Sequence, residues 1–432
     1  MRFRPLLFSL MVATACVAAP SFAKVIGQSV AALAITADRV AQLPAKDQAA
    51  WTAYLKRSQA QRAADKAALK AELKPGVTPP PLPEESHASG NSMPMDKPAD
   101  WYASPEARHV ADVIVSFQTP AGGWGKNQNR TGALRQPGQP YVLNNISKYL
   151  SPDDFDTPVE PDWNYVGTLD NNATTTELRF LAKVIGQAPG KEGDAWRASA
   201  VKGLNYLLDS QFPNGGWPQV WPLEGGYHDA ITYNDNAVAE AAEVLSAAAE
   251  GKGDYAFVPA DLRKKAAVAA AKGVDCILAT QVKVKGVLTV WGQQHDALTL
   301  EPVAARNFEP AELSSDESTD VLLYLMQQPH PSAGVKAAVR AGVAWIKASE
   351  LHDVAWTKTD DGRKLVPSPG AKPIWARYYS RATGLPVFGE RDKTIHDDVN
   401  ELSLERRNGY SWFNSSPQKV LDKYDAWDKA NP

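Results

Sequence analysis

The stretch QFPNGGWPQVWPLEGGYHDAITYNDN, residues 211–236, contains three signals that recur elsewhere in the chain. The first is a Gly-Gly turn closed by a tryptophan, at residues 215–217. The second is a run of Trp, Gly, Tyr and His of the kind found in surface loops. The third is an amide and carboxylate cluster, residues 234–236, which opens an Ala-rich run. Recurrence makes these signals informative, because an internal repeat predicts a repeat architecture.

The turn and the polar cluster both occur more than once. Residues 118–124 read QTPAGGW and residues 211–217 read QFPNGGW, so five of the seven positions match in the same register. A degenerate third copy spans residues 281–291. Polar clusters at 170–174, 235–237 and 315–319 each precede apolar residues at helical spacing. The repeated unit is therefore a helix, a Gly-Gly-Trp turn, a polar helix start and a second helix.

Helix pairs of this kind cannot bury their apolar faces alone, so neighbouring pairs must stack. We predict an all-α fold, a toroid-like ring of helix pairs, with polar helix starts and long loops forming a cleft at one end. Helices are expected at residues 104–118, 174–185, 196–211, 236–249, 260–281, 319–327 and 332–350. The segments 122–168, 213–235 and 352–415 are expected to be loops, and loops of that length are usually functional.

The N-terminus has the features of a secretory signal peptide. Arg2 and Arg4 precede a mostly apolar run, and Ser21, Phe22 and Ala23 fit a cleavage site. We therefore predict a signal peptide at 1–23, a secreted or periplasmic protein, and no membrane association of the mature chain. Removing the two arginines from the 46 basic residues leaves 44 against 49 acidic ones, a net charge of about −5. This balance argues against a nucleic-acid partner, and we expect a monomer.

Residues 24–97 form the next predicted unit. A helical composition extends to residue 74, with one break at Pro44, and a Pro-rich spacer follows. This segment is either a separate module or a strap on the main domain, which we expect to span residues 98–432 and to fold alone. Cys276, the one cysteine beyond the signal peptide, lies in an apolar helical run and is expected to be a buried core thiol.

Two helix starts offer oxygen ligands. Asp170 and Asn171 open one helix, and Asp235 and Asn236 open another. Carboxylate and amide oxygens suit a hard cation such as Ca²⁺, whereas clustered His and Cys residues, which zinc prefers, are lacking. Asp and Asn also cap helices, so capping and cation binding both remain open for these residues.

Arginines in aromatic loops point to an anionic ligand. They are Arg306 in PVAARNFEP, Arg377 and Arg381 in PIWARYYSRATG, and Arg391 in VFGERD. The planar guanidinium matches a carboxylate, and the flanking rings of Trp375, Tyr378 and Tyr379 are suited to stacking on a sugar. Each arginine alone fits a surface ion pair, but the set favours a polyanionic substrate.

A third set of polar residues, Asp296, Asp316 and Glu317, suggests the carboxylate pair of a glycosidase. Adjacent residues on a helix diverge by about 100°, so Asp316 and Glu317 fit helix-start acids better than a catalytic pair.

The chain resembles the pectate lyases of polysaccharide lyase family 10. The motifs that carry the resemblance are GGWGKN (122–127), LDNNATTTE (169–177), PNGGWPQ (213–219), YHDAITYNDNA (227–237), ARNFEP (305–310), PIWARYY (373–379) and LPVFGERD (385–392). They extend over about residues 100–415. The resemblance implies a toroid-like fold and Ca²⁺-dependent cleavage of α-1,4-linked polygalacturonate. The reaction it implies is an anti β-elimination, which gives oligogalacturonides unsaturated between C4 and C5.

The resemblance also implies roles for individual residues. By motif position, Arg391 matches the proton-abstracting arginine and Asp170 matches an active-site aspartate. Arg306 and Arg377 match positions that bind substrate carboxylates.

Further substrate contacts are implied for Asn171, Lys126 and Tyr378. The implied Ca²⁺ ligands are Asn171 and either Asp235 or Asp229. Asp235 is preferred because it repeats the Asp-Asn-Ala pattern of the first helix start.

Three other functions remain open. A non-catalytic carbohydrate-binding protein would keep the aromatic residues without needing an arginine base. A glycoside hydrolase on the same toroid would need two acids across the cleft. A terpene cyclase would need an Asp-rich motif such as DxDD, which the sequence lacks.

Overall fold

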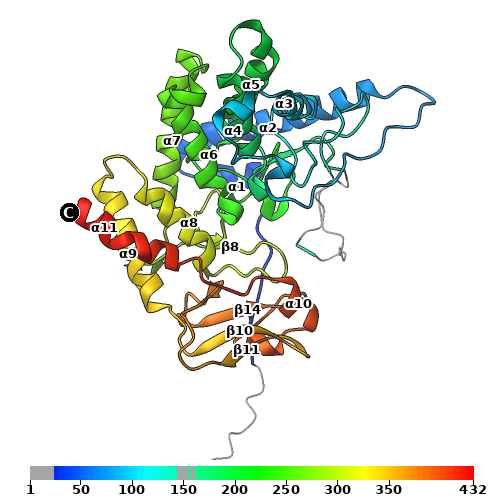
Figure 1. Ribbon diagram of the computed structural model, residues 1–432. Coiled ribbons are helices and arrows are strands. Elements are labelled where there is room, and N and C mark those ends of the chain that lie inside the picture. Colours follow the sequence, from blue (N-terminus) through cyan, green and yellow to red (C-terminus); the bar gives the residue numbers. More distant parts are fainter. Residues whose placement is uncertain (1–23, 144–153, 156–159, 161) are drawn as a thin grey trace, which may run out of the picture.

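The computed structural model describes residues 24–143, 154–155, 160 and 162–432, so the predicted signal peptide lies outside the described residues. Figure 1 shows a helical upper part and a lower part made of short strands. The α-helices in the described part are α1 Ala37–Ala41, α2 Ala45–Glu72, α3 Pro105–Ser116, α4 Thr175–Gly186, α5 Asp194–Ser210, α6 Ala237–Glu250, α7 Ala260–Thr280, α8 Ser315–Met326, α9 Ala333–Ala348, α10 Leu404–Gly409 and α11 Gln418–Ala430.

The strands are mostly two residues long. They are β1 Val25–Gln28, β2 Gly167–Thr168, β3 Val220–Trp221, β4 Ile231–Thr232, β5 Lys283–Val284, β6 Val287–Leu288, β7 Gln294–His295, β8 Pro302–Val303, β9 Leu313–Ser314, β10 Val354–Thr359, β11 Gly362–Pro367, β12 Trp375–Ala376, β13 Tyr378–Tyr379, β14 Pro386–Gly389, β15 Thr394–His396 and β16 Phe413–Asn414. Most of them connect loops rather than build a large sheet.

The helices form two rows, which confirms the predicted ring of helix pairs. Helices α3, α5, α7 and α9 contact one another in sequence order, and so do α4, α6 and α8. Each helix of the second row also packs on its neighbours in the first, as in the pairs α4 with α5 and α6 with α7. Helices α4 and α6 bury most of their residues, so the second row is the inner one.

A buried tryptophan ties each turn to the helix that precedes it. The indole N–H groups of Trp124, Trp217, Trp291 and Trp375 donate to carbonyls of Ile114, Leu207, Ile277 and Ile346, at 2.7, 2.8, 2.7 and 2.9 Å. All four rings are fully buried. The sequence predicted three copies of this turn, and the contact of Trp375 reveals a fourth.

A glutamine at the start of each predicted copy clips the turn to the next outer helix. Gln118 donates to Gly122 of its own turn and to Ser199 of α5. Gln211 repeats this pattern on Gly215 and Ala269, and Gln281 repeats it on Thr289 and Ala338. The matched glutamines of the sequence therefore hold successive repeats together.

Glycine is required in these turns because the backbone is left-handed and crowded. Gly215 has a φ of 95°, and a Cβ there would lie 2.1 Å from the Lys272 carbonyl oxygen. Gly122 has a φ of 111° and a similar conflict with Lys202. In the third copy the hairpin β5–β6 takes the place of the Gly-Gly turn, which explains why that copy looked degenerate.

The segment 352–415 is a β-rich layer, so its interpretation as a loop was wrong. A sheet in the order β1-β15-β14-β13-β9 is antiparallel throughout, and the hairpin β10–β11 lies in the same segment. Apart from β10 and β11, which have six residues each, the strands of this segment have two to four residues, too few alternating positions for the period of a strand to be recognised.

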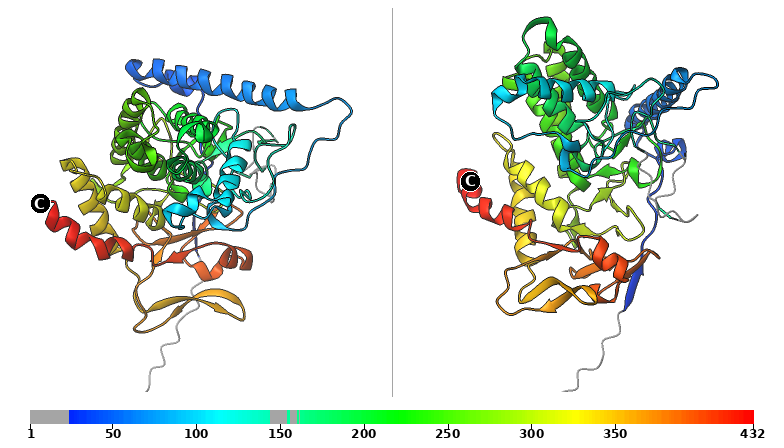
Figure 2. Two further views of the ribbon diagram at one scale, coloured as in Figure 1. Left: turned by 45° about the horizontal axis from the view of Figure 1, so that its top comes forward. Right: turned by 45° about the vertical axis from the view of Figure 1, so that its right-hand side comes forward.

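Residues 24–97 wrap around the rest of the chain as a strap. Strand β1 pairs with β15, and the Arg39 guanidinium lies 2.7 Å from Asp296. Helix α2 begins after Pro44 and lies along one side of the ring (Figure 2). Its Trp51 and Tyr54 are buried against Phe212. The centroid of the Phe212 ring lies 5.3 Å from that of Trp51 and 5.1 Å from that of Tyr54. Whether residues 98–432 fold alone stays a prediction, and these contacts weigh against it.

The remaining fold predictions concern boundaries, a thiol and the membrane. The expected helices are present within a few residues, with two exceptions. Helix α8 begins at Ser315 rather than at residue 319, and residues 24–36, expected to be helical, form strand β1 and an extended segment before α1 begins at Ala37. Cys276 is a buried free thiol, as predicted. Within the described ranges, no helix has the length and apolar character needed to cross a membrane.

Candidate active site

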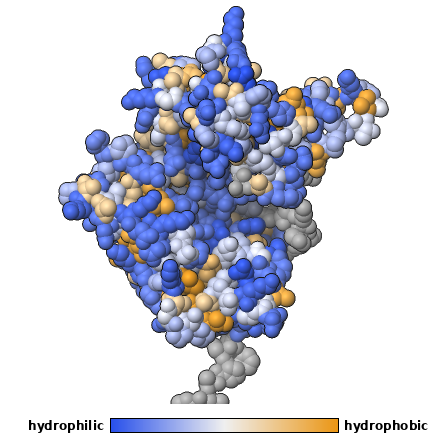
Figure 3. Space-filling model, in the orientation of Figure 1, coloured by the Kyte–Doolittle hydropathy of each residue, from blue (hydrophilic) through white to orange (hydrophobic). Residues whose placement is uncertain are grey.

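A polar cavity of about 320 Å³ lies where the inner helices begin. Figure 3 shows a recess of hydrophilic residues between the helical part and the β-rich layer. The cavity is lined by Lys126, Trp163, Thr168, Asp170, Asn171, Gln219, Val220, Tyr227, His228, Asn234, Asp235, Gln293, Gln294, Ala305, Arg306, Glu309 and Arg377. Repeats far apart in sequence therefore supply one site, as the sequence predicted for the polar helix starts.

The Asp and Asn residues at the helix starts do not cap their helices. The N-cap positions of α4 and α6, Thr174 and Asn236, make no side-chain capping hydrogen bond. Asn171 and Asp235 instead have φ values of 52° and 49°, a left-handed conformation that Asn and Asp tolerate better than most residues. Helix capping is therefore the wrong alternative for these side chains, and cation binding stays a prediction.

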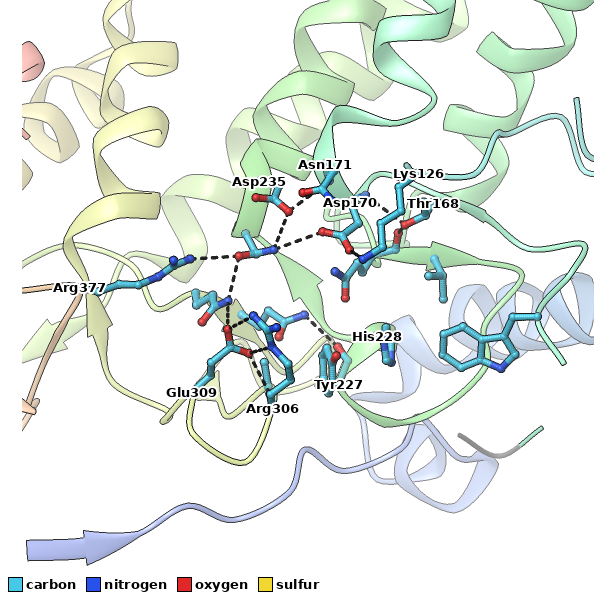
Figure 4. Close-up of a pocket in the computed structure, with 17 residues that line it drawn as sticks. Lys126, Thr168, Asp170, Asn171, Tyr227, His228, Asp235, Arg306, Glu309 and Arg377 are labelled. Atoms are coloured by element: carbon cyan, nitrogen blue, oxygen red, sulfur yellow. Dashed lines mark hydrogen bonds and ion pairs between the residues drawn. The ribbon is translucent and has the colours of Figure 1, made fainter. Parts of the chain in front are cut away.

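Asp170 and Asp235 face each other across the two helix starts (Figure 4). The Asn234 amide donates to both, at 3.4 Å to Asp170 and 3.0 Å to Asp235, and the Asn171 backbone N–H lies 3.1 Å from Asp235. Burial and the neighbouring Asp170 raise the pKa of Asp235 to about 8. Burial would also raise the pKa of Asp170, but the Lys126 ammonium outweighs it and holds that pKa below its usual value.

Lys126 lies at the same end of the cavity and forms an ion pair with Asp170. It follows directly on the first Gly-Gly-Trp turn, so the repeat itself delivers this ammonium to the site. The side chain is 22% exposed, which leaves it open to a ligand in the cavity.

Arg306 lies across the cavity from the two aspartates and is held by Glu309 (Figure 4). Its Nε and Nη2 atoms donate to the two Glu309 oxygens at 2.9 and 2.6 Å. Burial lowers the pKa of Arg306, but the Glu309 carboxylate outweighs it and the pKa lies above its ordinary value. Burial in turn would raise the pKa of Glu309, and Arg306 lowers it to about 2. This bidentate pair fixes the guanidinium while its side chain stays 42% exposed.

Arg377 reaches the cavity from the link between β12 and β13. It forms an ion pair with buried Glu317 and donates to the Asn234 side chain at 3.2 Å. Burial raises the pKa of Glu317 even though Arg377 opposes it. Glu317 is therefore the partner of an arginine rather than one half of a glycosidase pair.

Arg391, the predicted proton-abstracting residue, is not among the described residues that line the cavity. Its guanidinium lies 5.4 Å above the Phe308 ring and donates to both Glu405 oxygens at 3.0 Å. The hydrogen bonds that Arg391 donates to Glu405 raise the pKa of Arg391, as Glu309 raises that of Arg306, so the pKa shifts do not separate the two arginines. Arg306 lies over the same ring at 4.9 Å, so Arg391 is a neighbour of the site at its edge.

Two other predicted site residues serve the structure around the cavity. Tyr378 is fully buried, so its ring cannot stack on a sugar; its hydroxyl bonds Gln293, which lines the cavity. The Asp229 carboxylate accepts the backbone N–H groups of Glu224 and Gly225, both at 3.0 Å, and does not line the cavity. The aspartate preferred from the Asp-Asn-Ala pattern, Asp235, is the one that lines it.

Sequence reasoning missed the aromatic wall of the cavity. Trp163, Tyr227 and His228 line it, with the Trp163 and His228 rings 4.7 Å apart and the Tyr227 and His228 rings stacked at 4.0 Å. Burial, with Lys126 nearby, lowers the pKa of His228 to about 3, so the imidazole is neutral. Tyr227 and His228 belong to a quoted motif, but nothing in the sequence placed Trp163 beside them.

The remaining predicted carboxylates lie away from the cavity. Asp296 pairs with Arg39 and accepts two backbone N–H groups, at residues 298 and 299. Asp316 accepts the Ser416 hydroxyl at 2.6 Å. These contacts are structural, as the helix-start interpretation predicted for Asp316.

Comparisons with known proteins agree with this fold and site. The pectic acid lyase family model matches residues 118–421. Among solved structures, a family 10 polysaccharide lyase from Cellvibrio cellulosa is 33% identical, with a TM-score of 0.64 over 78% of this chain and 97% of its own. An aspartate-to-alanine mutant of a family 10 lyase from the same organism, in complex with a trigalacturonic acid ligand, matches with the same values. No curated protein matches significantly.

A family model that covers most of the chain and solved structures above 30% identity together define the class. The chain belongs to the pectic acid lyase family. It is a pectate lyase, an enzyme, and this excludes the non-catalytic and terpene cyclase alternatives.

Proposed function

We propose that the enzyme cleaves polygalacturonate by a Ca²⁺-dependent β-elimination in the cavity described above. The observation that carries the proposal is the cavity itself, in which Arg306 and Arg377 face Asp170 and Asp235. The related Cellvibrio lyase with trigalacturonic acid supports an oligogalacturonide as the ligand.

Charge within the cavity supports an anionic sugar bound together with a cation. The described lining residues include three cationic side chains, Lys126, Arg306 and Arg377, and three carboxylates, Asp170, Asp235 and Glu309. With all six ionised the wall is neutral, and with Asp235 protonated, as its raised pKa favours near pH 7, the wall carries one positive charge. A bound divalent cation would give the wall a net positive charge, and two of the carboxylates would coordinate it.

The donor set at the two helix starts fits Ca²⁺. Asp170 and Asp235 supply carboxylate oxygens, and Asn171 supplies an amide oxygen, which are the ligands this hard cation takes. No group of three or more His, Cys, Asp or Glu side chains suited to a metal occurs in the described part of the chain. Water and a substrate carboxylate would complete the six to eight ligands that Ca²⁺ requires. When bound, the cation would withdraw charge from the uronate carboxylate and acidify the proton at C5.

The chain's own residues then orient the sugar and move the proton. Arg377, held by Glu317, is placed to bind a carboxylate of the sugar. A base removes the C5 proton, the electron pair forms the C4–C5 double bond, and the C4–O glycosidic bond breaks. The leaving oxygen takes a proton from solvent or a neighbouring acid, so atoms and charge balance.

We assign the base to Arg306 in preference to Arg391. Arg306 opens into the cavity opposite the aspartates, and its Nη1 makes no hydrogen bond to another described residue. Arg391 does not line the cavity. Both guanidinium groups pair with a glutamate, so the position of Arg306 in the cavity carries the assignment. A guanidinium must lose a proton before it can act as a base, so activity should increase toward alkaline pH.

The test compares Arg306→Ala with Arg391→Ala on polygalacturonate, by following the ultraviolet absorbance of the unsaturated product. Arg306→Ala should lower kcat by a factor of about 10² to 10⁴ while calorimetry still detects binding of trigalacturonate. Arg391→Ala should retain most of kcat. If the large loss appeared only in Arg391→Ala, the base would be Arg391, and if neither variant lost activity the arginine mechanism would be wrong.

Export and oligomeric state are also proposed. We infer that residues 1–23 direct the protein out of the cytoplasm, because of their charged start and apolar run, and that the enzyme acts as a monomer. Mass spectrometry of the mature N-terminus and light scattering would test the two statements.

A further inference from the structure

A second polar cavity, of about 270 Å³, adjoins the active site. The two cavities share Asn171 and Asp235 in their walls. The rest of the second cavity is lined by Ser86, His87, Ala88, Gly90, Asn91, Asn127 and Asn172. More than half of its wall residues thus come from the N-terminal strap, which lies outside the stretch matched by the family model.

The strap is fixed at this point by paired backbone. Ser86 N–H donates to the Asn127 carbonyl at 2.8 Å, Asn129 N–H donates to the Glu84 carbonyl at 2.9 Å, and Glu85 bridges to Gln128. Residues 84–86 therefore lie like an added strand along the loop that carries Lys126, and the short 3-10 helix Ser89–Ser92 follows them. This wall is built into the structure and does not rest on side-chain positions alone.

A buried polar group anchors the far end of this wall. The Asn91 amide donates to Glu177 at 2.6 Å and to the Gly125 carbonyl at 3.1 Å, and its side chain is buried. Glu177 in turn pairs with Arg130. The anchor leaves the imidazole of His87 exposed on the cavity side of the strap.

The chemistry of the wall matches an uncharged or anionic sugar face. The lining groups are amides, a hydroxyl and an imidazole, with Asp235 as the single carboxylate among the described lining residues. Amides and imidazoles can both donate and accept hydrogen bonds, as hydroxyl-rich uronates require. The volume is close to the lower end of small-molecule sites, roughly 300 to 1,000 Å³.

We propose that residues 86–91 of the strap form a further subsite for the galacturonate chain, beyond the Asn171 and Asp235 end of the active site. His87 contributes a hydrogen bond to a sugar residue there. The proposal rests on the proposed function, because it assumes that a galacturonate chain occupies the first cavity. It makes the strap a determinant of preference for long over short chains.

The test measures kcat and KM of the full-length enzyme on tri- and hexagalacturonate, for His87→Ala and Ala88→Glu. Ala88 is exposed and extended, so the glutamate fits the fold and places a negative charge on the wall. For His87→Ala, KM on the hexamer should increase by roughly two- to tenfold, because the loss of one hydrogen bond weakens binding by about that factor. Values of kcat, and KM on the trimer, should not change. Ala88→Glu should have a larger effect in the same direction.

His352→Ala, which removes an exposed histidine of the β-rich layer, is the matched control and should behave as the wild type. Calorimetry of hexagalacturonate binding to the Arg306→Ala variant, with and without His87→Ala, separates the subsite from turnover. Weaker hexamer binding with unchanged trimer binding would support the subsite even if the catalytic assignment failed. Equal effects on both chain lengths, or no effect in either strap variant, would overturn it while leaving the lyase function intact.

Discussion

The ion pair between Arg130 and Glu177 allows the link between the strap and the active site to be tested. Both side chains are completely buried, and they lie 3.0 Å apart. The Arg130 guanidinium also donates to the Gly125 carbonyl, next to Lys126, and Glu177 accepts the Asn91 amide of the strap. Burial lowers the pKa of Arg130 although Glu177 opposes it, so the charged arginine depends on this partner.

Glu177→Gln keeps the shape and one acceptor oxygen but removes the charge. An uncompensated buried charge costs about 3 to 5 kcal/mol, so the free energy of unfolding should fall by that amount. Guanidinium denaturation followed by the fluorescence of the 13 tryptophans would measure it. The control Asp254→Asn breaks an exposed pair with Lys183, at 3.8 Å, and should cost at most about 1 kcal/mol.

A second substitution distinguishes the charge from the shape. Adding Arg130→Met to Glu177→Gln removes the stranded charge, while the introduced amide oxygen still accepts the Asn91 amide, so most of the lost stability should return. A loss below about 1 kcal/mol in Glu177→Gln, within the range of an exposed pair, would refute the reasoning. An equal loss in the single and double variants would show that packing, rather than charge, makes this site sensitive.

Three further predictions concern the metal, the strap and pH. Asp235→Ala should abolish turnover at moderate Ca²⁺ with partial rescue by excess metal, and full activity of the wild type in strong chelator would contradict this. Trp51→Ala should reduce the free energy of unfolding by about 3 to 5 kcal/mol, and deletion of residues 24–97 should reduce it further; an unchanged thermal transition in the deletion variant would show that residues 98–432 are self-sufficient. Because the pKa of Glu309 is lowered to about 2 in the folded protein, the ionised Glu309 stabilises the fold. This stabilisation is fully present above pH about 4.3, the ordinary pKa of a glutamate, and is lost as the pH falls toward about 2. Between pH 5 and pH 2, the melting temperature should therefore fall less steeply for Glu309→Gln than for the wild type.

The repeated turn made the toroid predictable, because each of its residues has a local task. The glutamine clips the next helix, the glycines fit a crowded turn, and the tryptophan closes on the preceding helix. The fourth copy escaped notice because its Trp375 follows a β-hairpin instead of a glutamine and two glycines. Residues 352–415 were misjudged for a related reason, since short strands are determined by long-range pairing and not by their own sequence.

The site was predictable where residue type alone limits the chemistry. Asp170, Asn171, Asp235, Arg306 and Arg377 were named by their chemistry and Lys126 by the family resemblance, and the structure brings all six to one cavity. Tyr378 and Asp229 lie near it, but their side chains bond neighbouring protein groups, the Gln293 side chain and the Glu224 backbone N–H. Arg391 has the same chemistry as Arg306 and a glutamate partner of the same kind, and only the position of Arg306 in the wall of the cavity separates the two. A linear motif carries no information about which arginine faces the cavity.

The arrangement of the cavity follows from the direction of the inner helices. Helices α4, α6 and α8 all begin at the same end of the ring, so their polar starts meet there while their apolar residues fill the core. Each arginine that faces this end has its own buried glutamate, Glu309 for Arg306 and Glu317 for Arg377. Such partners hold a guanidinium in place before the substrate arrives, so less entropy is lost on binding. They also cancel its charge at a distance, so the Ca²⁺ that we propose at the two aspartates would add the positive charge that attracts a polyanion.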